Sequence, residues 1–262
     1  MDSFYHRVLR RLVAEGRLDP TAATLVVAGG AFDAEVLADL GFTEATISNL
    51  DARPSEAVAE RFAWAQEDAE ALSFADRSFD QVFVHAGLHH CASPHRALAE
   101  MYRVSARAVL VFEARDGLLM RLAVRLGLTD AYEVEAVIAN DGRAGGVRNS
   151  AVPNHVYRWT EREVAKTVAS LDPTGPPQIR YFYGLRLPIE RLRMARARHK
   201  LLAARLLSAV RLVFTTVLPR QGNQFAFLIE RPKQTWPWID AQGEFNHAWA
   251  AQHYRLGPPD QG

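Results

Sequence analysis

The sequence is poor in cysteine. Cys91 is the only one among 262 residues, so no disulfide can form within the chain. This usage suits a reducing compartment, and we expect the cytoplasm. Long apolar runs are also missing, because no stretch reaches the roughly 18–20 charge-poor residues of a membrane-spanning helix. The first residues mix apolar side chains with arginines and acids, unlike a secretory signal. We therefore expect a soluble protein that at most touches a membrane surface.

An excess of one charge is lacking as well. The chain has 31 Lys and Arg against 30 Asp and Glu, which leaves a formal net charge of +1 and gives no general case for a nucleic-acid partner. With 48% hydrophobic residues, the chain can bury a large core. This favours one domain over residues 1–235, followed by a tail over residues 236–262.

Two nucleotide-binding motifs are absent, the G-x-G-x-x-G fingerprint and the G-x-x-x-x-G-K-[ST] phosphate loop. What is present is an apolar run, residues 24–27, that enters Gly29 and Gly30 and continues in a helical pattern. A strand, a tight turn and a helix have this order, and glycine lets a ligand approach the backbone of such a turn. An ordinary βα turn has the same sequence pattern, so the turn gains meaning only from features further along the chain.

Strand and helix patterns alternate over most of the chain with short connections, which predicts a doubly wound α/β fold. The predicted strands span residues 24–27, 42–51, 78–85, 108–113, 178–183 and 224–230. Residues 63–72 are predicted to form a short strand that runs into a polar loop. The predicted helices include residues 4–17, 94–104 and 160–171.

Asp51 ends the second predicted strand, about 20 residues after the glycine turn. At this spacing a carboxylate takes the ribose hydroxyls of a nucleotide cofactor. An N-cap for a helix starting near Pro54 is the alternative, and both roles can hold together. We favour the ribose role.

The order of several motifs resembles class I S-adenosylmethionine-dependent methyltransferases of the small-molecule type. These motifs are the Gly29–Gly30 turn, Asp51, the loop Glu67–Asp68–Ala69–Glu70, Ser78–Phe79–Asp80 and Leu88–His89–His90. The resemblance covers residues 20–115, the predicted cofactor-binding half. It implies S-adenosylmethionine as the cofactor and a Rossmann-like, seven-stranded sheet whose last two strands form an antiparallel edge pair.

The resemblance also implies roles for single residues. Gly29 and Gly30 would wrap the methionine part of the cofactor, Asp51 would bind its ribose, and Asp68 with Ala69 would contact its adenine. We add His85, at the tip of the fourth strand, to the predicted cofactor-binding residues. The sequence departs from the family where a three-glycine turn after an acid is expected, and where Ser105–Ala106–Arg107 replaces K-P-G-G.

A cluster of imidazoles and one thiol lies near the end of the fourth strand and comprises His85, His89, His90, Cys91 and His95. A metal site is one interpretation, but neither C-x-x-C nor H-E-x-x-H spacing is present, so we expect no metal. General base catalysis is the second interpretation, because histidine accepts a proton near neutral pH. The third is that the pair of histidines only orders the loop. We predict His85 or His89 as the base.

Residues 130–160 form a long polar stretch with several glycines, which is typical of a lid or a binding loop. Disorder is the alternative, but it would make poor use of the flanking aromatic residues. The predicted substrate-binding residues are Arg115, Asn140, Arg148, Asn149, Tyr157 and Arg158. The run N-x-V-Y-R-W-T-E at residues 154–161 adds a similarity to methyltransferases of surface-polysaccharide or natural-product sugar biosynthesis.

Residues 186–219 separate the last two predicted strands and carry many leucines and basic side chains. Between Arg180 and Arg220 inclusive there are ten Lys and Arg and one acid, Glu190. Such a basic amphipathic helix can lie on an anionic membrane or receive an anionic substrate. A core-facing helix or a homodimer contact through residues 190–217 explains the pattern equally well.

Taken with the resemblance, these features predict methyl transfer from S-adenosylmethionine, with O-methylation of a polar small molecule or a sugar-type acceptor as the specific reaction. A nicotinamide-dependent oxidoreductase is one alternative, because it shares the βα turn and the acid at Asp51. A non-catalytic module that docks a membrane or a partner through its basic helix is another. Cofactor binding separates these interpretations.

Overall fold

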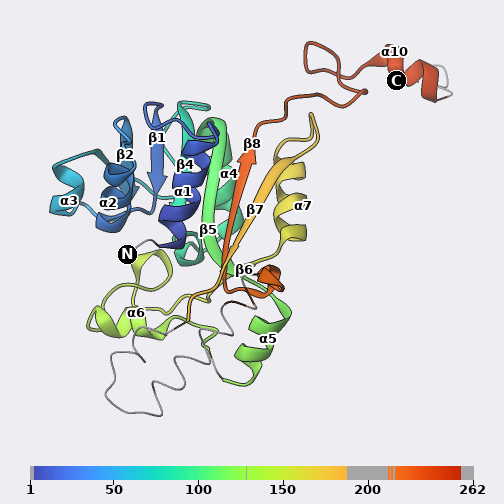
Figure 1. Ribbon diagram of the computed structural model, residues 1–262. Coiled ribbons are helices and arrows are strands. Elements are labelled where there is room, and N and C mark those ends of the chain that lie inside the picture. Colours follow the sequence, from blue (N-terminus) through green and yellow to red (C-terminus); the bar gives the residue numbers. More distant parts are fainter. Residues whose placement is uncertain (1–2, 128, 188–211, 213, 215, 255–262) are drawn as a thin grey trace, which may run out of the picture.

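One mixed sheet organises the computed structural model, which describes residues 3–127, 129–187, 212, 214 and 216–254 (Figure 1). Within these residues the sheet has eight strands. Their bounds are β1 (Thr24–Val27), β2 (Ala45–Asn49), β3 (Ala63–Gln66), β4 (Phe79–His85), β5 (Ser105–Arg115), β6 (Arg158–Trp159), β7 (Gln178–Gly184) and β8 (Gln224–Glu230).

The strand order is β3-β2-β1-β4-β5-β8-β7, with β6 paired to β5 beside this path. The first five strands are parallel to their neighbours, whereas β8 runs antiparallel to both β5 and β7. This confirms the predicted doubly wound sheet with its antiparallel edge pair. The chain reverses direction across the sheet between β1 and β4, and ligands of such folds bind at the carboxyl ends of strands at that point.

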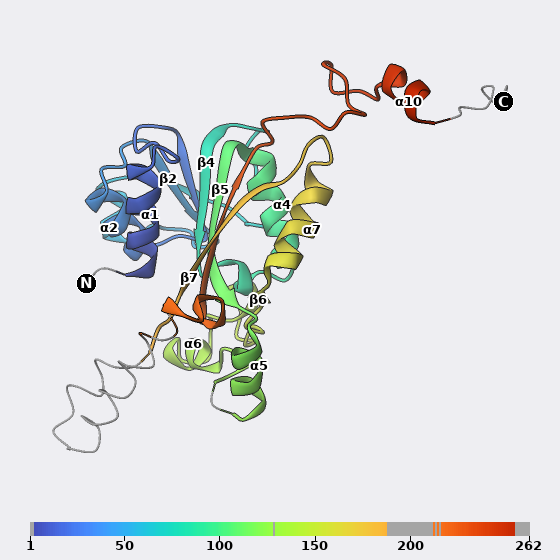
Figure 2. The same cartoon turned by 45° about the vertical axis from the view of Figure 1, so that its right-hand side comes forward.

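The helices of the described residues cover both faces of the sheet. Their bounds are α1 (Phe4–Ala14), α2 (Ala31–Asp39), α3 (Glu56–Ala59), α4 (Pro94–Val104), α5 (Leu118–Arg125), α6 (Val134–Ala139), α7 (Glu161–Leu171) and α10 (His247–His253), with short 3₁₀ turns η1 (Leu88–His90), η2 (Val147–Asn149) and η3 (Pro219–Gln221). Figures 1 and 2 show α1 and α2 on one face, α4 and α7 on the other, and α5 and α6 beyond the carboxyl ends of the parallel strands.

Alternation along the strands fills two hydrophobic cores, one on each face. In β1, Val26 packs into the core under α1 and α2, whereas Leu25 and Val27 pack into the core under α4 and α7. Helix α1 buries its apolar stripe, including Leu9 and Leu12, against the first of these cores. The strands are buried on both sides, as expected for a parallel sheet between two helical layers.

The predicted helix starts agree with the capping chemistry. Thr160 and Glu163 form a capping box at α7, in which Glu163 N donates to Thr160 Oγ1 at 3.2 Å. Helix α4 begins at Pro94, and the side chain of Ser93 accepts a hydrogen bond from Arg96 N. Proline suits this first position because its missing N–H would have no partner there.

Several predicted elements need correction. The stretch 130–160 contains α6, η2 and the two-residue strand β6, where a continuous loop was predicted. In β6, Arg158 and Trp159 align with Ala114 and Arg115 of β5, and Trp159 is fully buried. Two residues are too few to show a strand period in the sequence. Strand β5 also begins earlier than predicted, at Ser105.

The predicted helical insert at residues 186–219 and the contact surface at residues 190–217 lie mostly outside the described residues. The tail contains α10 and a stacked pair of indoles, Trp236 and Trp238. It leaves the end of the sheet opposite α5 and α6 (Figure 1). The division of the chain at residue 235 stays a prediction. None of the helices among the described residues combines the length and apolar character needed to span a bilayer.

Candidate active site

The turn after β1 is sterically constrained. A Cβ at Gly29 would lie 2.7 Å from Val26 Cγ1 and 2.9 Å from Ile47 Cγ2, so only glycine fits there without displacing core atoms. Ala28, just before it, has a φ of 52°, a left-handed conformation that costs an L-residue about 1–2 kcal/mol. Nothing lies within 4 Å of a Cβ at Gly30, which caps α2 and donates its N–H to Asp33. Backbone strain at this turn marks it as a functional position.

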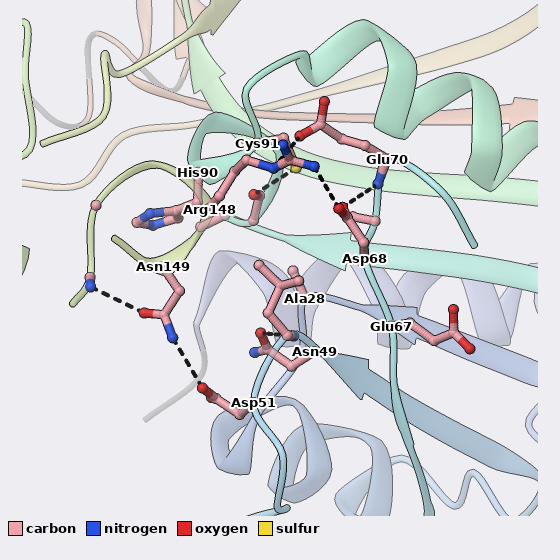
Figure 3. A pocket seen from close by; sticks show the side chains of 16 residues that line it. Ala28, Asn49, Asp51, Glu67, Asp68, Glu70, His90, Cys91, Arg148 and Asn149 are labelled. Atoms are coloured by element: carbon pink, nitrogen blue, oxygen red, sulfur yellow. Dashed lines mark hydrogen bonds and ion pairs between the residues drawn. The ribbon is translucent and has the colours of Figure 1, made fainter. Parts of the chain in front are cut away.

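A cavity of about 260 Å³ lies at the carboxyl ends of β1, β2 and β4 (Figure 3). The residues that line it belong to four turns and the loop of η2. They are Ala28, Asn49, Leu50, Asp51, Glu67, Asp68, Ala69, Glu70, Ala86, Gly87, His90, Cys91, Gly145, Gly146, Arg148 and Asn149. The cavity thus lies at the crevice that the strand order predicts for a ligand.

Carboxylates form one wall of this cavity. Asp68 accepts a hydrogen bond from Glu70 N at 2.9 Å. Burial would raise the pKa of Asp68, but the hydrogen bonds from Glu70 N and Arg148 lower it, so this carboxyl is ionised at neutral pH. Glu70 is buried and accepts from the backbone N–H groups of Ala92 and Ser93. Glu70 therefore holds the loop after β4, whereas Asp68 faces the cavity, where Arg148 also contacts it.

Residues 145–149, which we call the lid loop, close the opposite side of the cavity. Arg148 donates to Asp68 Oδ2 at 2.8 Å, and Asn149 Nδ2 donates to Asp51 Oδ1 at 3.1 Å (Figure 3). A Cβ at Gly146 would lie 1.9 Å from Val152 O, so the loop needs glycine at that close approach. The lid loop thus contacts both carboxylates that the sequence assigns to cofactor binding.

His89 lies between two carboxylates. Its Nδ1 is 2.7 Å from Glu113 Oε2, and its Nε2 is 3.3 Å from Glu133 Oε2. Burial would lower the pKa of His89, but Glu113 and Glu133 outweigh it and raise the pKa to about 10. With a proton held this way, His89 cannot accept another from a substrate.

His85 has the opposite environment. Its ring stacks on Tyr5 of α1, with centroids 4.4 Å apart and planes at 10°, and lies 5.4 Å from the ring of Phe32. Burial lowers the pKa of His85 to about 4, so the ring is neutral at pH 7 and can accept a proton. Its side chain does not line the cavity. It ends β4 on the side of α1, next to the half-exposed ring of Phe32.

The structure brings together some of the predicted site residues and separates others. Five of them line the cavity: Asp51, Asp68, Ala69, Arg148 and Asn149. Four lie at the same edge of the sheet without lining it: Gly29, Gly30, His85 and His89. Their assigned roles stay predictions.

The remaining predicted substrate-binding residues have internal partners. Arg115 is buried, pairs with Glu161 at 2.9 Å and lies over the Tyr183 ring. Asn140 donates to Ala136 O within its own helix end.

Tyr157 donates to Glu163, and Arg158 donates to the backbone carbonyls of Val156 and Asp130. Each of these side chains therefore has a partner within the chain, which the sequence could not show. Their predicted contacts with a substrate stay predictions.

Other cavity residues were missed by sequence reasoning. Asn49 Nδ2 donates to Gly29 O at 3.0 Å and so fixes the turn. A Cβ at Gly87 would lie 2.7 Å from Ala28 Cβ, which places the turns after β1 and β4 in contact. Asn49 ends β2 and Gly87 follows β4. A position at the carboxyl end of a strand was the sequence signal that could have identified both residues.

The comparisons with known proteins agree with this geometry. Residues 26–111 match a family model described as a methyltransferase domain. No curated protein sequence matches the chain.

Among solved structures, magnesium protoporphyrin IX methyltransferase from Synechocystis PCC 6803 with bound SAH is 13% identical with a TM-score of 0.52, over 87% of this chain and 82% of that one. The YcgJ protein of Bacillus subtilis is 16% identical with a TM-score of 0.51, over 87% of this chain and 100% of that one. A SAM-dependent methyltransferase from Archaeoglobus fulgidus is 12% identical with a TM-score of 0.50, over 86% of this chain and 94% of that one. At these identities the solved structures show the fold.

The fold and the site define a nucleotide-cofactor enzyme of the doubly wound α/β class. Residues 26–111 match a methyltransferase domain, and the fold agrees with that of the S-adenosylmethionine-dependent methyltransferases among the solved structures. S-adenosylmethionine is its cofactor, and the chemistry of the cavity fits it. Carboxylates lie at the ends of β2 and β3, and the turn after β1 has no room for a side chain at Gly29.

Proposed function

We propose that this methyltransferase O-methylates a polar small molecule. The observation that carries the proposal is that the chain's own lid loop covers the cavity and hydrogen-bonds to Asp51 and Asp68. The cavity volume of about 260 Å³ falls just below the range of about 300–1,000 Å³ usual for ligand sites. A loop of the chain's own across the cofactor cavity favours an acceptor small enough to reach the methyl group beneath that loop.

The roles within the cavity follow from its polar groups. Asp51 would bind the ribose hydroxyls and Asp68, with the backbone near Ala69, the adenine. When bound, S-adenosylmethionine supplies a sulfonium methyl carbon, which forms a bond to the acceptor oxygen as the bond to sulfur breaks and S-adenosylhomocysteine leaves. The lid loop would exclude water and hold both partners in line, and positioning of this kind accounts for much of the acceleration in such transfers.

A hydroxyl acceptor must also lose its proton, and His85 is the group we assign to this step. Its neutral ring at pH 7 can accept that proton, whereas the doubly paired His89 cannot. Tyr5 and Phe32 hold the His85 ring from one side, so its orientation is fixed. The half-exposed ring of Phe32 offers an apolar surface to the carbon skeleton of the acceptor.

The proposal extends to the kind of acceptor and to the compartment. The similarity of residues 154–161 favours a sugar-type acceptor from polysaccharide or natural-product biosynthesis, by analogy alone. The single cysteine favours the cytoplasm as the location. Burial raises the pKa of Cys91 to about 12, so its thiol does not compete as a nucleophile.

The test is calorimetric titration of the purified chain with S-adenosylmethionine and, separately, with NADH. We expect saturable binding of S-adenosylmethionine in the micromolar range, none of NADH, and loss of binding in Asp51→Ala. Asp39→Ala is the matched control, because Asp39 is an exposed acid at the end of α2. Transfer of a labelled methyl group to hydroxyl-bearing acceptors then tests the reaction. Methylation confined to amine or carbon acceptors would overturn the O-methylation proposal.

A further inference from the structure

Three side chains from two distant segments converge beside the cofactor cavity. His89 and His90 belong to η1, and Glu133 immediately precedes α6. Glu133 Oε2 lies 3.3 Å from His89 Nε2 and 3.5 Å from His90 Nε2. All three ligand atoms lie within 4.8 Å of one another.

A second set of groups orients His89 and Glu133. Glu113, whose side chain is fully buried, holds His89 Nδ1 at 2.7 Å and also accepts from Leu88 N at 2.7 Å. Glu133 Oε2 accepts from Asn154 Nδ2 at 3.3 Å, and Glu133 N donates to Asn154 O at 3.0 Å. A carboxylate on the far nitrogen of a ligating histidine is the usual support of a metal-bound imidazole.

The two imidazoles and the carboxylate thus bring Nε2 of each histidine and Oε2 of Glu133 to a common space.

We propose that His89, His90 and Glu133 bind a divalent transition-metal ion of the zinc type and leave one coordination position open. With metal–ligand bonds of about 2.0–2.1 Å, tetrahedral ligand atoms lie about 3.3 Å apart. The measured separations of 3.3 and 3.5 Å match this spacing. Two histidines and one glutamate form a known catalytic set, in which the fourth position takes water or substrate.

Charge balance supports the same conclusion. Glu113 and Glu133 bring two negative charges to a mostly buried site, and one divalent ion bound by neutral imidazoles compensates both. In the metal-free chain, a proton on His89 and an Nε2–H on His90 account for the same contacts with Glu133. Binding of the ion would release these protons, as metal binding to histidines does.

The position of the ion has a consequence for the reaction. His90 lines the cofactor cavity, so an ion on His90 would lie at the wall of that cavity. Its open position would take the acceptor oxygen, which would lower the pKa of an acceptor hydroxyl. This last step rests on the proposed function, whereas metal binding itself does not.

The experiment titrates the full chain, freed of metal with a chelator, with Zn²⁺ by calorimetry and with Co²⁺ by visible absorption. We expect one equivalent to bind and Co²⁺ to give the spectrum of a four- or five-coordinate site. Glu133→Gln and His90→Gln should each weaken binding at least 100-fold. Glu113→Gln should weaken it 10–100-fold with all three ligands intact, as for supporting residues elsewhere.

The matched control is His95→Gln. His95 Nε2 lies 3.2 Å from Glu163 Oε1, so it forms a similar histidine–carboxylate pair, but among the described residues no third ligand joins it. This variant should bind metal like the wild type. Failure of the wild type to bind one equivalent, or equal binding by Glu133→Gln, would overturn the proposal. If the ligand variants do not fold, the wild-type stoichiometry and the Co²⁺ spectrum decide.

Titration of the same preparations with S-adenosylmethionine separates the two proposals. If the chain binds the cofactor but no metal, the proposed metal site is wrong and the proposed function stands. If the chain binds metal but no cofactor, the metal site stands and its role in methyl transfer is wrong.

Discussion

Asn149 donates its side-chain amide to Asp51 across 3.1 Å, although 98 positions of sequence separate the two residues. Arg148, its neighbour, reaches Asp68 at 2.8 Å. The φ angles of Arg148 and Asn149 are 51° and 56°, so both lie in the left-handed region. The lid loop therefore holds a strained backbone in order to contact the two carboxylates of the cofactor site.

Arg148→Ala tests whether the lid loop secures the cofactor. We expect S-adenosylmethionine to dissociate about three- to tenfold faster, because the ion pair with Asp68 and the closure of the loop would both slow its release. Stopped-flow fluorescence measures this rate. Arg143→Ala, an exposed arginine on the same segment, is the control. Tighter binding in Arg148→Ala would mean instead that Arg148 competes with the cofactor for Asp68.

Much of the fold could be predicted from the sequence, because its signals are local. The apolar run of β1, the Thr160–Glu163 capping box and the alternation of strands and helices all lie within short windows. Strand β6 escaped prediction because its two residues carry no period. What defines it is pairing with β5 and complete burial of Trp159, and both depend on tertiary structure.

The site was predictable in part for the same reason. Spacing selected Asp51 and the family resemblance selected Asp68, and both line the cavity, although their roles stay predictions. No local pattern links Glu133 to His89 and His90, more than 40 positions earlier, and the sequence therefore gave no metal spacing. The sequence also does not show that Glu161 pairs with Arg115, because the two residues lie far apart along the chain.

Ala28→Gly tests the strain in the turn after β1. Because Ala28 has a φ of 52°, glycine should adopt this conformation more easily and stabilise the chain by about 1 kcal/mol. For a chain of this size, this raises the melting temperature by about 2–4 °C. Ala34→Gly, in the middle of α2, should lower stability by a similar or larger amount. Calorimetric melting curves of both variants measure these changes in stability. If Ala28→Gly is less stable than the wild type, the packing of the Ala28 Cβ against the turn after β4 outweighs the backbone strain.

His85→Asn tests the assigned base. Loss of a general base typically lowers kcat by about 10²–10⁴-fold, and we expect a loss in this range with little change in the affinity for S-adenosylmethionine. Because the pKa of His85 is lowered to about 4, the wild-type kcat should stay constant above about pH 5 and fall only below it, where the ring becomes protonated. Initial rates across this pH range provide the measurement. A change in KM alone would assign His85 to substrate positioning.

Asp33 makes stability depend on pH in a direction unusual for a carboxyl group. Burial raises its pKa to about 6, against the opposing hydrogen bond from Gly30 N. Between about pH 4 and 6 the folded chain therefore binds more protons at this site than the unfolded chain, whose carboxyl has a pKa of about 3.9. The contribution of Asp33 to stability is then full below about pH 4 and is lost as the pH rises through 6.

Asp33→Asn removes this titration and keeps an oxygen that can accept from Gly30 N. A difference of about two pKa units corresponds to about 3 kcal/mol at 1.36 kcal/mol per unit. We therefore expect the variant to gain about 2–3 kcal/mol relative to the wild type between pH 4 and pH 7, measured by urea unfolding at both values. Asp39→Asn, at an exposed position of the same helix, should show no such gain. The free energies of unfolding of Asp33→Asn and the wild type could instead differ by the same amount at both pH values. Asp33 would then be ionised at both, and the buried carboxylate would need a compensating positive charge. Tyr5, its neighbour in α1, cannot supply that charge.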